Sequence, residues 1–456
     1  MRYKKFPETH FRKQFKILTI NRIGMPIQNT LKNKKILVAT TPAAGHFNPL
    51  TGLAKYLSEN GNDVRWYTSA DFKDKLHQMS LHHYSFKRAL DVNFEDINTY
   101  FPERSKLKSP IERMNFDMIN LFANRSSEYF LDIVEIYEDF EFDLVLCDNT
   151  FSASPILRSE LNIPVVVVGV MPLAEESKFL GPYGLGIIPP VNPLERFKNR
   201  LMTLVLKNIL AKNSIQSFSQ ILKQYKIKDT NTPLLNLLVK KADLFLQIGS
   251  QGFEYFRPDL GHNVRYIGAL MPFSEPITDY WFDERLNQYS KVILVTQGTV
   301  EKNLHNLIIP TLEAFKNSEF LIVVTTGGNQ TKKLQEEYTM DNVIIADYIP
   351  YQYIMPYVHV YVTNGGYGGV IQSLKYKLPI VAAGMFEGKS EICSRIGYFN
   401  YGIDLKTETP NAESIRQAVI EVFENNFYKE NVKRLSLDFD KMYPEELSSI
   451  YINELF

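Results

Sequence analysis

The sequence predicts an α/β protein in which two doubly wound parallel sheets face each other across a cleft. Short apolar runs alternate with stretches of helical periodicity, as repeated β-α-β units require. Runs such as 165–168 are apolar on both faces, which is typical of a central parallel strand covered by helices. The alternation occurs twice, on either side of a turn-rich segment at 271–290, and the chain of 456 residues is long enough for two or three domains.

The first array opens with a β-α-β pattern after Lys35. Its first helix is expected to end at Asn60-Gly61, because glycine adopts a left-handed conformation after a last helical turn without steric cost. We assign 33–270 to this N-terminal domain. Its expected strands are 36–40, 64–68, 143–147 and 164–168, and its expected helices are 49–59 and 114–130.

The second array begins at Val292. Its expected strands are 292–296, 320–325, 343–346, 360–363 and 379–383, and its expected helices are 304–315 and 370–376. We assign 271–290 to a linker, 291–430 to the C-terminal domain and 431–456 to closing helices. Ligands of such sheets bind at the carboxyl ends of the strands, so the cleft between the two domains is the expected site.

The first 35 residues carry ten Lys or Arg and one acidic residue, Glu8. We interpret 1–32 as a basic, disordered leader, with Met25 as an alternative start of the native protein; the other interpretation is an arm that binds a membrane surface. The whole chain has 51 residues of each charge, and this balance argues against a nucleic-acid binder.

Cysteine content and hydropathy indicate the cellular setting of the protein. Two cysteines, Cys147 and Cys393, cannot form a disulfide framework or a four-ligand zinc site, so a reducing, cytoplasmic setting is expected. The longest apolar run, 163–174, is too short to span a bilayer and contains two prolines and a glycine. We therefore expect no stable insertion into a membrane.

The turn at 41–47 places His46 where the chain leaves a strand and enters a helix, at the mouth of the expected cleft. The positive end of the helix dipole disfavours the charged imidazolium, which would help His46 to stay neutral and accept a proton. A lone histidine at a turn is, however, more often incidental.

Asp148 ends the strand 143–147 and so projects from the same carboxyl edge. A carboxylate that accepts a hydrogen bond from one imidazole nitrogen fixes the tautomer and stabilises the charged ring. The alternative is that Asp148 caps the following helix together with its neighbours Asn149 and Thr150.

A glycine-rich turn links the strand 360–363 to a helix and reads Asn364-Gly365-Gly366-Tyr367-Gly368-Gly369. Backbone N–H groups at such a helix start can face a diphosphate. The spacing matches neither the dinucleotide nor the P-loop pattern, and glycines also make tight turns. Two further strand ends, Gly298-Thr299 and Tyr348-Ile349, should open onto the same edge, where Thr299 offers a hydroxyl and Tyr348 a ring for stacking a base.

Together these motifs resemble the family 1 glycosyltransferases with the GT-B fold of two Rossmann-like domains, which include macrolide, flavonoid and glucuronosyl transferases. The resemblance extends from about Lys35 to the C-terminus. It implies that His46 is the general base on the acceptor hydroxyl, that Asp148 orients it, and that the final segment, 445–456, crosses back onto the N-terminal domain. The motifs that carry it are Gly45-His46-x-x-Pro49, Asp148, Ile267-Gly268, Tyr348-Ile349-Pro350 and the glycine-rich turn.

The chain departs from the family pattern at the expected diphosphate and ribose contacts. Asn364 replaces a histidine, Gly369 replaces a serine or threonine, and Gln372 replaces the glutamate that pairs with ribose. The backbone donors of Gly365, Gly366, Gly368 and Gly369 remain, and the Asn364 and Gln372 amides can still form hydrogen bonds. The glycine pattern also resembles that of a bacterial branch, so we interpret it as a variant donor site.

The corner that reads the donor sugar in many relatives corresponds to Gly388-Lys389, between Glu387 and Glu391. We assign Glu387 and Lys389 to the donor site; the alternative is a solvated, charged helix start. Tyr348 stands in place of a tryptophan that stacks on uracil, and it does not select uracil over thymine.

We therefore predict an inverting, metal-independent glycosyltransferase that needs no cofactor. It would move a sugar from a UDP- or dTDP-sugar to a hydroxyl of a small, largely apolar acceptor of phenolic, flavonoid or macrolide type. Phe151, Met171 and Phe386 follow strand ends and are the candidate acceptor contacts. The sequence leaves open the natural acceptor, the donor sugar and the oligomeric state.

Two alternatives remain. A GT-B sugar-nucleotide 2-epimerase would need additional acid/base carboxylates in the cleft. A catalytically idle relative that activates a partner glycosyltransferase is suggested by Asn364, Gly369 and Gln372, but such a protein has no need of His46 and Asp148.

Overall fold

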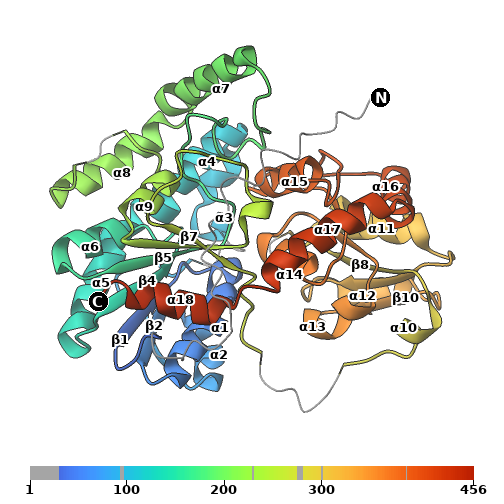
Figure 1. The fold of residues 1–456 in the computed structure, drawn as a ribbon, viewed down its shortest axis with the longest axis horizontal. Helices are drawn as coiled ribbons and strands as arrows, with labels where there is room; N and C mark the ends of the chain where they lie inside the picture. Colours follow the sequence, from blue (N-terminus) through green and yellow to red (C-terminus); the bar gives the residue numbers. More distant parts are fainter. Residues whose placement is uncertain (1–29, 93–96, 229–230, 275–280, 299–300, 387) are drawn as a thin grey trace.

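A computed structural model describes residues 30–456 except 93–96, 229–230, 275–280, 299–300 and 387. Figure 1 shows two α/β lobes side by side. We call the part built on strands β1–β7 the N-terminal lobe and the part built on β8–β13 the C-terminal lobe. Within the described residues, none of the helices has the length and apolar character needed to cross a membrane.

The N-terminal lobe is built on a seven-stranded sheet in the order β3-β2-β1-β4-β5-β6-β7, with every adjacent pair parallel. Strands β4, β5 and β6 are buried along their whole length. The chain reverses its direction of growth between β1 and β4, and such a switch point is where ligands bind in sheets of this kind. The strands are β1 Lys35–Ala39, β2 Asp63–Thr68, β3 His82–Ser85, β4 Leu144–Asp148, β5 Val165–Gly169, β6 Leu244–Ile248 and β7 Val264–Gly268.

Helices cover both faces of this sheet. The first helix begins at Ala44, five residues before the predicted start, and so contains Pro49 as its sixth residue, where the proline lacks the backbone N–H that would bond to Gly45. The predicted helix 114–130 is interrupted by a π-helical segment, Met118–Ala123. The helices are α1 Ala44–Glu59, α2 Lys73–Gln78, α3 Ile97–Tyr100, α4 Pro110–Asp117, α5 Arg125–Asp139, α6 Ser154–Leu161, α7 Pro193–Val205, α8 Lys212–Gln224 and α9 Leu234–Lys241.

The C-terminal lobe repeats this architecture with six parallel strands in the order β10-β9-β8-β11-β12-β13, so its switch point lies between β8 and β11. The fold class predicted from the sequence is confirmed, and three strands coincide with their predicted ranges. The strands are β8 Val292–Thr296, β9 Leu321–Thr325, β10 Val343–Ala346, β11 Val360–Thr363, β12 Ile380–Ala382 and β13 Gly402–Asp404.

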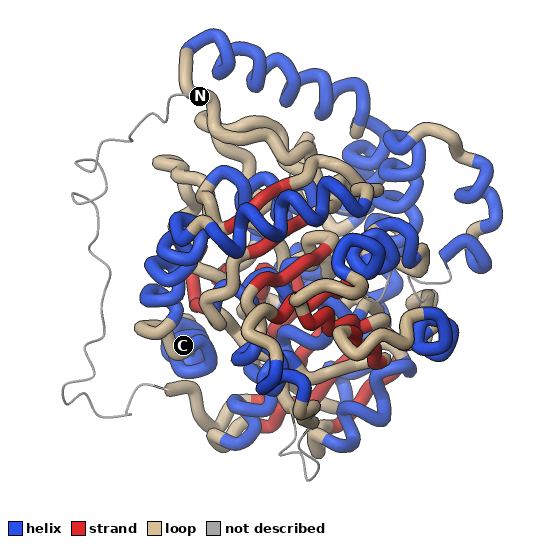
Figure 2. Tube along the Cα trace, turned by 90° about the vertical axis from the view of Figure 1, so that its right-hand side faces the viewer, coloured by secondary structure: helices blue, strands red, loops and turns tan. Residues whose placement is uncertain are grey.

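The helices of the second half surround this sheet, as the strands (red) and helices (blue) of Figure 2 show. Helix α14 begins three residues before its predicted start, inside the glycine-rich turn. The helices are α10 Arg285–Gln288, α11 Ile308–Phe315, α12 Thr331–Glu337, α13 Tyr351–Ile354, α14 Tyr367–Lys375, α15 Lys389–Tyr398, α16 Ala412–Glu424, α17 Asn426–Phe439 and α18 Pro444–Asn453.

The last helix, α18, lies on the N-terminal lobe, where it contacts α1, β6 and β7 (Figure 1). Residues 1–29 of the predicted leader lie outside the described residues. Leu31, also assigned to that leader, is fully buried and donates its backbone N–H to Ser449 Oγ of α18 at 2.9 Å. The first described residues of the chain therefore contact its last helix.

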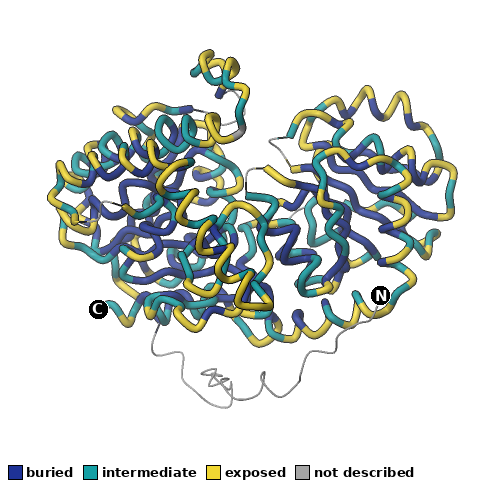
Figure 3. The backbone as a smooth tube through the Cα atoms, turned by 90° about the horizontal axis from the view of Figure 1, so that it is seen from above, coloured by how far each residue is buried: buried dark blue, intermediate teal, exposed yellow. Residues whose placement is uncertain are grey.

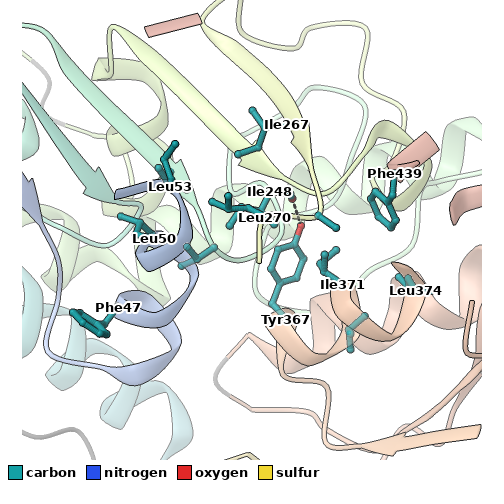
Figure 4. Close-up of a cluster of buried hydrophobic side chains, with 14 of the residues drawn as sticks. Phe47, Leu50, Leu53, Ile248, Ile267, Leu270, Tyr367, Ile371, Leu374 and Phe439 are labelled. Atoms are coloured by element: carbon teal, nitrogen blue, oxygen red, sulfur yellow. Dashed lines mark hydrogen bonds between the residues drawn. The ribbon is translucent and has the colours of Figure 1, made fainter. Parts of the chain in front are cut away.

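One apolar cluster joins the two lobes. It combines Phe47, Leu50 and Leu53 of α1 with Tyr367 and Ile371 of α14 and with side chains near the ends of β6 and β7 (Figure 4). Figure 3 shows the buried core of each lobe enclosed by exposed outer chain. Helices α1 and α14, which follow the two switch points, are therefore packed at the lobe boundary.

Candidate active site

His46 and Asp148 meet at the switch point of the N-terminal sheet. Helix α1 starts soon after β1, which places His46 in its first turn, and Asp148 is the last residue of β4. The two strands are paired with Ala39 opposite Cys147, so their carboxyl ends are level. The His46 Nδ1 and Asp148 Oδ1 atoms lie 2.8 Å apart.

Asp148 is fully buried and accepts hydrogen bonds from two threonines as well as from His46. Thr41 donates its backbone N–H at 2.8 Å and its hydroxyl at 2.9 Å, and Thr150 donates its backbone N–H at 2.8 Å. Burial alone would raise the pKa of Asp148, but the charge and hydrogen bond of His46 and the donors of Thr150 and Thr41 lower it below its ordinary value. Asp148 holds this turn instead of capping α6, which begins only at Ser154.

The arrangement fixes the imidazole tautomer. An ionised carboxylate only accepts hydrogen bonds, so Nδ1 of His46 carries the proton and Nε2 of a neutral ring is left as an acceptor. The His46 side chain is 20% exposed, which leaves part of its surface accessible. The pair can therefore act as a general base with a fixed orientation.

Replacing Asp148 with asparagine is expected to lower the free energy of unfolding by about 1–3 kcal/mol near neutral pH, because buried donors lose a charged acceptor. The lowered pKa means that the carboxylate contributes stability above its unfolded pKa and loses it as pH falls through the folded value. The difference between wild type and Asp148→Asn in urea unfolding should thus shrink as pH falls from about 5 toward about 2. A difference that does not change with pH would show that packing, not charge, causes it.

The glycine-rich turn between β11 and α14 exposes backbone donors at a helix start. Gly365 has φ +89° and donates its N–H to Thr363 Oγ1 at 3.2 Å. A Cβ at Gly366 or Gly368 would have no heavy atom within 4 Å, so space is open beside the first N–H groups of α14. Such groups have no partner inside the helix and can bind an anion.

Gly365→Ala is expected to destabilise the protein by about 1–3 kcal/mol, because a side chain at positive φ is strained. Its Cβ would also lie 2.7 Å from the buried Cys393 Sγ. Gly366→Ala is the matched control, since Gly366 has φ −63° and open space around it. Urea unfolding of both variants tests this, and equal losses of stability would contradict the assigned role of Gly365.

Two departures from the family pattern have structural causes. The Asn364 side-chain amide donates to the backbone carbonyl of Gln297 at 2.6 Å, so it ties the end of β11 to the loop after β8. Its proposed contact with a diphosphate stays a prediction. A Cβ at Gly369 would lie 2.5 Å from the hydroxyl of Tyr361, which is almost fully buried, so this position has no room for a serine or threonine.

The remaining candidate residues of the donor site differ in the exposure of their side chains. The Tyr348 ring is 73% exposed, whereas Ile349 is fully buried and has only its backbone available. Gly298 is exposed with φ +75°, and Lys389 is the half-buried first residue of α15. Thr299 and Glu387 lie outside the described residues.

The acceptor candidates differ in burial. Phe151 is fully buried, and its ring stacks on Tyr129 with centroids 4.8 Å apart. The assignment of Phe151 as an acceptor contact is therefore wrong for this structure: it is a core residue, because the turn after β4 folds inward. Met171 is half-buried and Phe386 is 57% exposed, and their contacts with an acceptor stay predictions.

Glu391 is not part of a solvated helix start, because it is buried in a charged network between the lobes. Its carboxylate pairs with Arg395 at 2.8 Å and accepts the N–H groups of Gly184 and Gly186 at 2.9 Å each. Arg395 also pairs with Glu254 of the N-terminal lobe at 2.9 Å. Burial alone would lower the pKa of Arg395, but the charges of Glu254 and Glu391 raise it. No local sequence pattern indicates this link between the loop that carries Gly184 and Gly186 and helix α15.

Several contacts bring the two candidate half-sites together. The Tyr367 hydroxyl, from the first residue of α14, donates to the carbonyl of Ile248 at 2.6 Å (Figure 4). Gln247 donates to Tyr367 Oη at 3.1 Å and to the carbonyl of Met171 at 3.0 Å. Pro49, one turn after His46, lines a small cavity together with Gly368 and Gln372. His46 and the glycine-rich turn thus lie on helices that meet at the lobe boundary.

Known proteins resemble this chain over most of its length. A family model described as UDP-glucoronosyl and UDP-glucosyl transferase matches residues 62–446. The 4'-demethylrebeccamycin synthase of Lentzea aerocolonigenes is 28% identical over 88% of this chain and 94% of its own length. The UDP-glycosyltransferase 2 of Phaeomoniella chlamydospora is 29% identical over 89% of this chain and 92% of its own length.

Solved structures share the fold at low sequence identity. The glycotransferase of kitacinnamycin has a TM-score of 0.71 at 16% identity, covering 93% of this chain and 99% of its own. The calicheamicin glycosyltransferase CalG4 has a TM-score of 0.70 at 18% identity, covering 93% and 98%. The two-lobed architecture is thus the GT-B fold.

Proposed function

The chain belongs to the UDP-glucoronosyl and UDP-glucosyl transferase family and is a glycosyltransferase, and on this basis we propose that it inverts the configuration of the sugar it transfers. The donor is a UDP- or dTDP-sugar. The acceptor is a small, largely apolar molecule that offers a hydroxyl group. The observation that carries this proposal is the hydrogen bond between His46 and Asp148 at the switch point of the N-terminal sheet.

The reaction follows from the orientation of the imidazole. Nε2 of His46 takes the proton of the acceptor hydroxyl while the oxygen attacks the anomeric carbon. The bond between that carbon and the diphosphate breaks, and the nucleoside diphosphate leaves with its electron pair. Asp148 stabilises the imidazolium that forms, because it stays ionised. One displacement from the face opposite the leaving group inverts the anomeric carbon.

The diphosphate is held by the first N–H groups of α14. Further candidate donors are Asn364, Lys389 and the hydroxyl of Thr299. Open space beside Gly366 and Gly368 supports a close approach of phosphate oxygens to the backbone. Tyr348 stacks on the base, and Gln372 pairs with the ribose. Preorganised donors of this kind stabilise the charge on the leaving group, so no metal ion or other cofactor is required.

An acceptor of natural-product type is supported by relatives named after rebeccamycin and calicheamicin. Met171 and Phe386 are the residues that we assign to its apolar part. Both cysteines are buried free thiols, which supports a reducing, cytoplasmic setting.

Turnover by the purified chain tests the proposal. It should be incubated with UDP- and dTDP-sugars and with phenolic, flavonoid and macrolide acceptors, and products followed by mass spectrometry. We expect a glycoside and free nucleoside diphosphate in equal amounts, only when both substrates are present. Isomerisation of UDP-GlcNAc without an acceptor would favour a 2-epimerase. Inactivity of the chain alone, with stimulation of another glycosyltransferase, would favour an activator.

A further inference from the structure

Exposed apolar side chains are concentrated on one segment of the N-terminal lobe. Nine of the 24 large hydrophobic side chains that are exposed in the described chain lie between 185 and 209. They are Leu185, Ile188, Val191, Leu194, Phe197, Leu201, Leu204, Val205 and Ile209. A concentration of this kind in a soluble protein marks an interaction surface.

Helix α7 presents two different faces. Asn199 is buried against the lobe, whereas Leu194, Phe197, Leu201 and Leu204 are between 52% and 77% exposed. Their spacing of three or four residues places them on one side of the helix. Figure 1 shows α7 at the outer edge of the N-terminal lobe, and we call this exposed apolar side of the helix the ridge.

Basic residues flank that ridge. Arg196, Lys198 and Arg200 of α7 are exposed, and no ion pair of theirs occurs within the described part of the chain, whereas Lys207 pairs with Glu176. The one acidic residue in the sequence between 191 and 213 is Glu195. Its carboxylate accepts the backbone N–H of Val191, just before α7, at 2.8 Å. The surface thus combines apolar side chains with unneutralised positive charge.

We propose that this α7 surface, made of Leu194, Phe197, Leu201, Leu204, Arg196, Lys198 and Arg200, docks the enzyme on an anionic membrane. The apolar side chains enter the interface between headgroups and acyl chains, and the basic side chains pair with lipid phosphates. The helix lies in the plane of the interface and does not cross the bilayer.

The charge and the position of the α7 surface favour an anionic membrane over a second copy of the chain as its binding partner. Two α7 surfaces packed on each other would bring the basic residues of both copies together, which costs free energy. A helix at the outer edge of the lobe can also lie flat on a membrane surface. The inference does not depend on the proposed donor or acceptor.

Vesicle flotation tests the proposal with the full chain. Wild type should float with vesicles of phosphatidylcholine and phosphatidylglycerol and should bind pure phosphatidylcholine much more weakly. Leu194→Ser/Phe197→Ser/Leu201→Ser should weaken binding to the anionic vesicles on the order of tenfold or more, because it removes the inserted apolar area. Arg196→Gln/Lys198→Gln/Arg200→Gln should weaken binding to the anionic vesicles alone.

The matched control is Leu131→Ser/Phe427→Ser/Leu437→Ser, which removes the same side-chain types from exposed positions elsewhere. It should bind as wild type does, and all variants should keep the wild-type melting temperature. Residues 1–29 are present in every variant, so their charge cannot cause a difference. Failure of wild type to float, or full binding by the α7 variants, would overturn the proposal. A wild-type dimer that the α7 variant converts to a monomer would overturn it as well.

Discussion

His46→Ala is expected to lower kcat by about 10²- to 10⁴-fold, the usual contribution of a positioned general base. The affinity for the nucleotide-sugar should stay nearly unchanged, because His46 lies on α1 of the N-terminal lobe and the proposed donor contacts lie on the other lobe. Steady-state kinetics give kcat, and calorimetry with the donor gives Kd. The larger part of the rate enhancement should survive the substitution, because the alignment of the two substrates contributes about 7–11 kcal/mol, which is more than the general base contributes.

His77→Ala is the control for that experiment, because His77 is exposed at the end of α2. This variant should keep the kcat of wild type. A His46→Ala enzyme that turns over normally but has lost donor affinity would show that His46 serves the donor site and not the acceptor hydroxyl.

Arg395→Met is expected to lower the free energy of unfolding by about 3–5 kcal/mol, because it leaves the buried carboxylate of Glu391 without its cation and leaves Glu254 with only the longer pair to Arg257, at 3.7 Å. Glu254 and Glu391 are both at most 5% exposed. Urea unfolding measures the loss. Arg434→Met, an exposed arginine on α17, should change stability by less than about 0.5 kcal/mol.

A second variant separates charge from packing. Adding Glu391→Gln to Arg395→Met should recover a large part of the lost stability, because Glu254 keeps Arg257 as a partner at 3.7 Å and the other buried carboxylate is removed. A loss that this double variant does not recover would show that the network acts through packing. A loss for Arg395→Met below about 1 kcal/mol would contradict its place as the link between the lobes.

Local sequence patterns predict those features that depend on strand ends and chain order. Asp148 ends a buried strand, and His46 lies in the first turn of the helix after the neighbouring strand, so their contact follows from the sheet topology once both strands are recognised. Val360–Thr363 and the glycines after it likewise identify the second half-site.

Features that depend on three-dimensional neighbours could not be predicted. Thr41 and Thr150 bind Asp148, but a threonine in a turn carries no signal of such a partner. Glu254 and Arg395 are 141 residues apart in the chain, so nothing local indicates their pairing. Phe151 follows a strand end yet points into the core, because the position after a strand does not fix the direction of a side chain.

The anomeric configuration of the product tests the central claim most directly, namely that one imidazole base assists a single displacement at the anomeric carbon. Proton NMR of the glycoside formed from an α-linked UDP-sugar distinguishes the two outcomes. The His46–Asp148 mechanism predicts a β-glycoside. An α-glycoside would require retention of configuration and would contradict it.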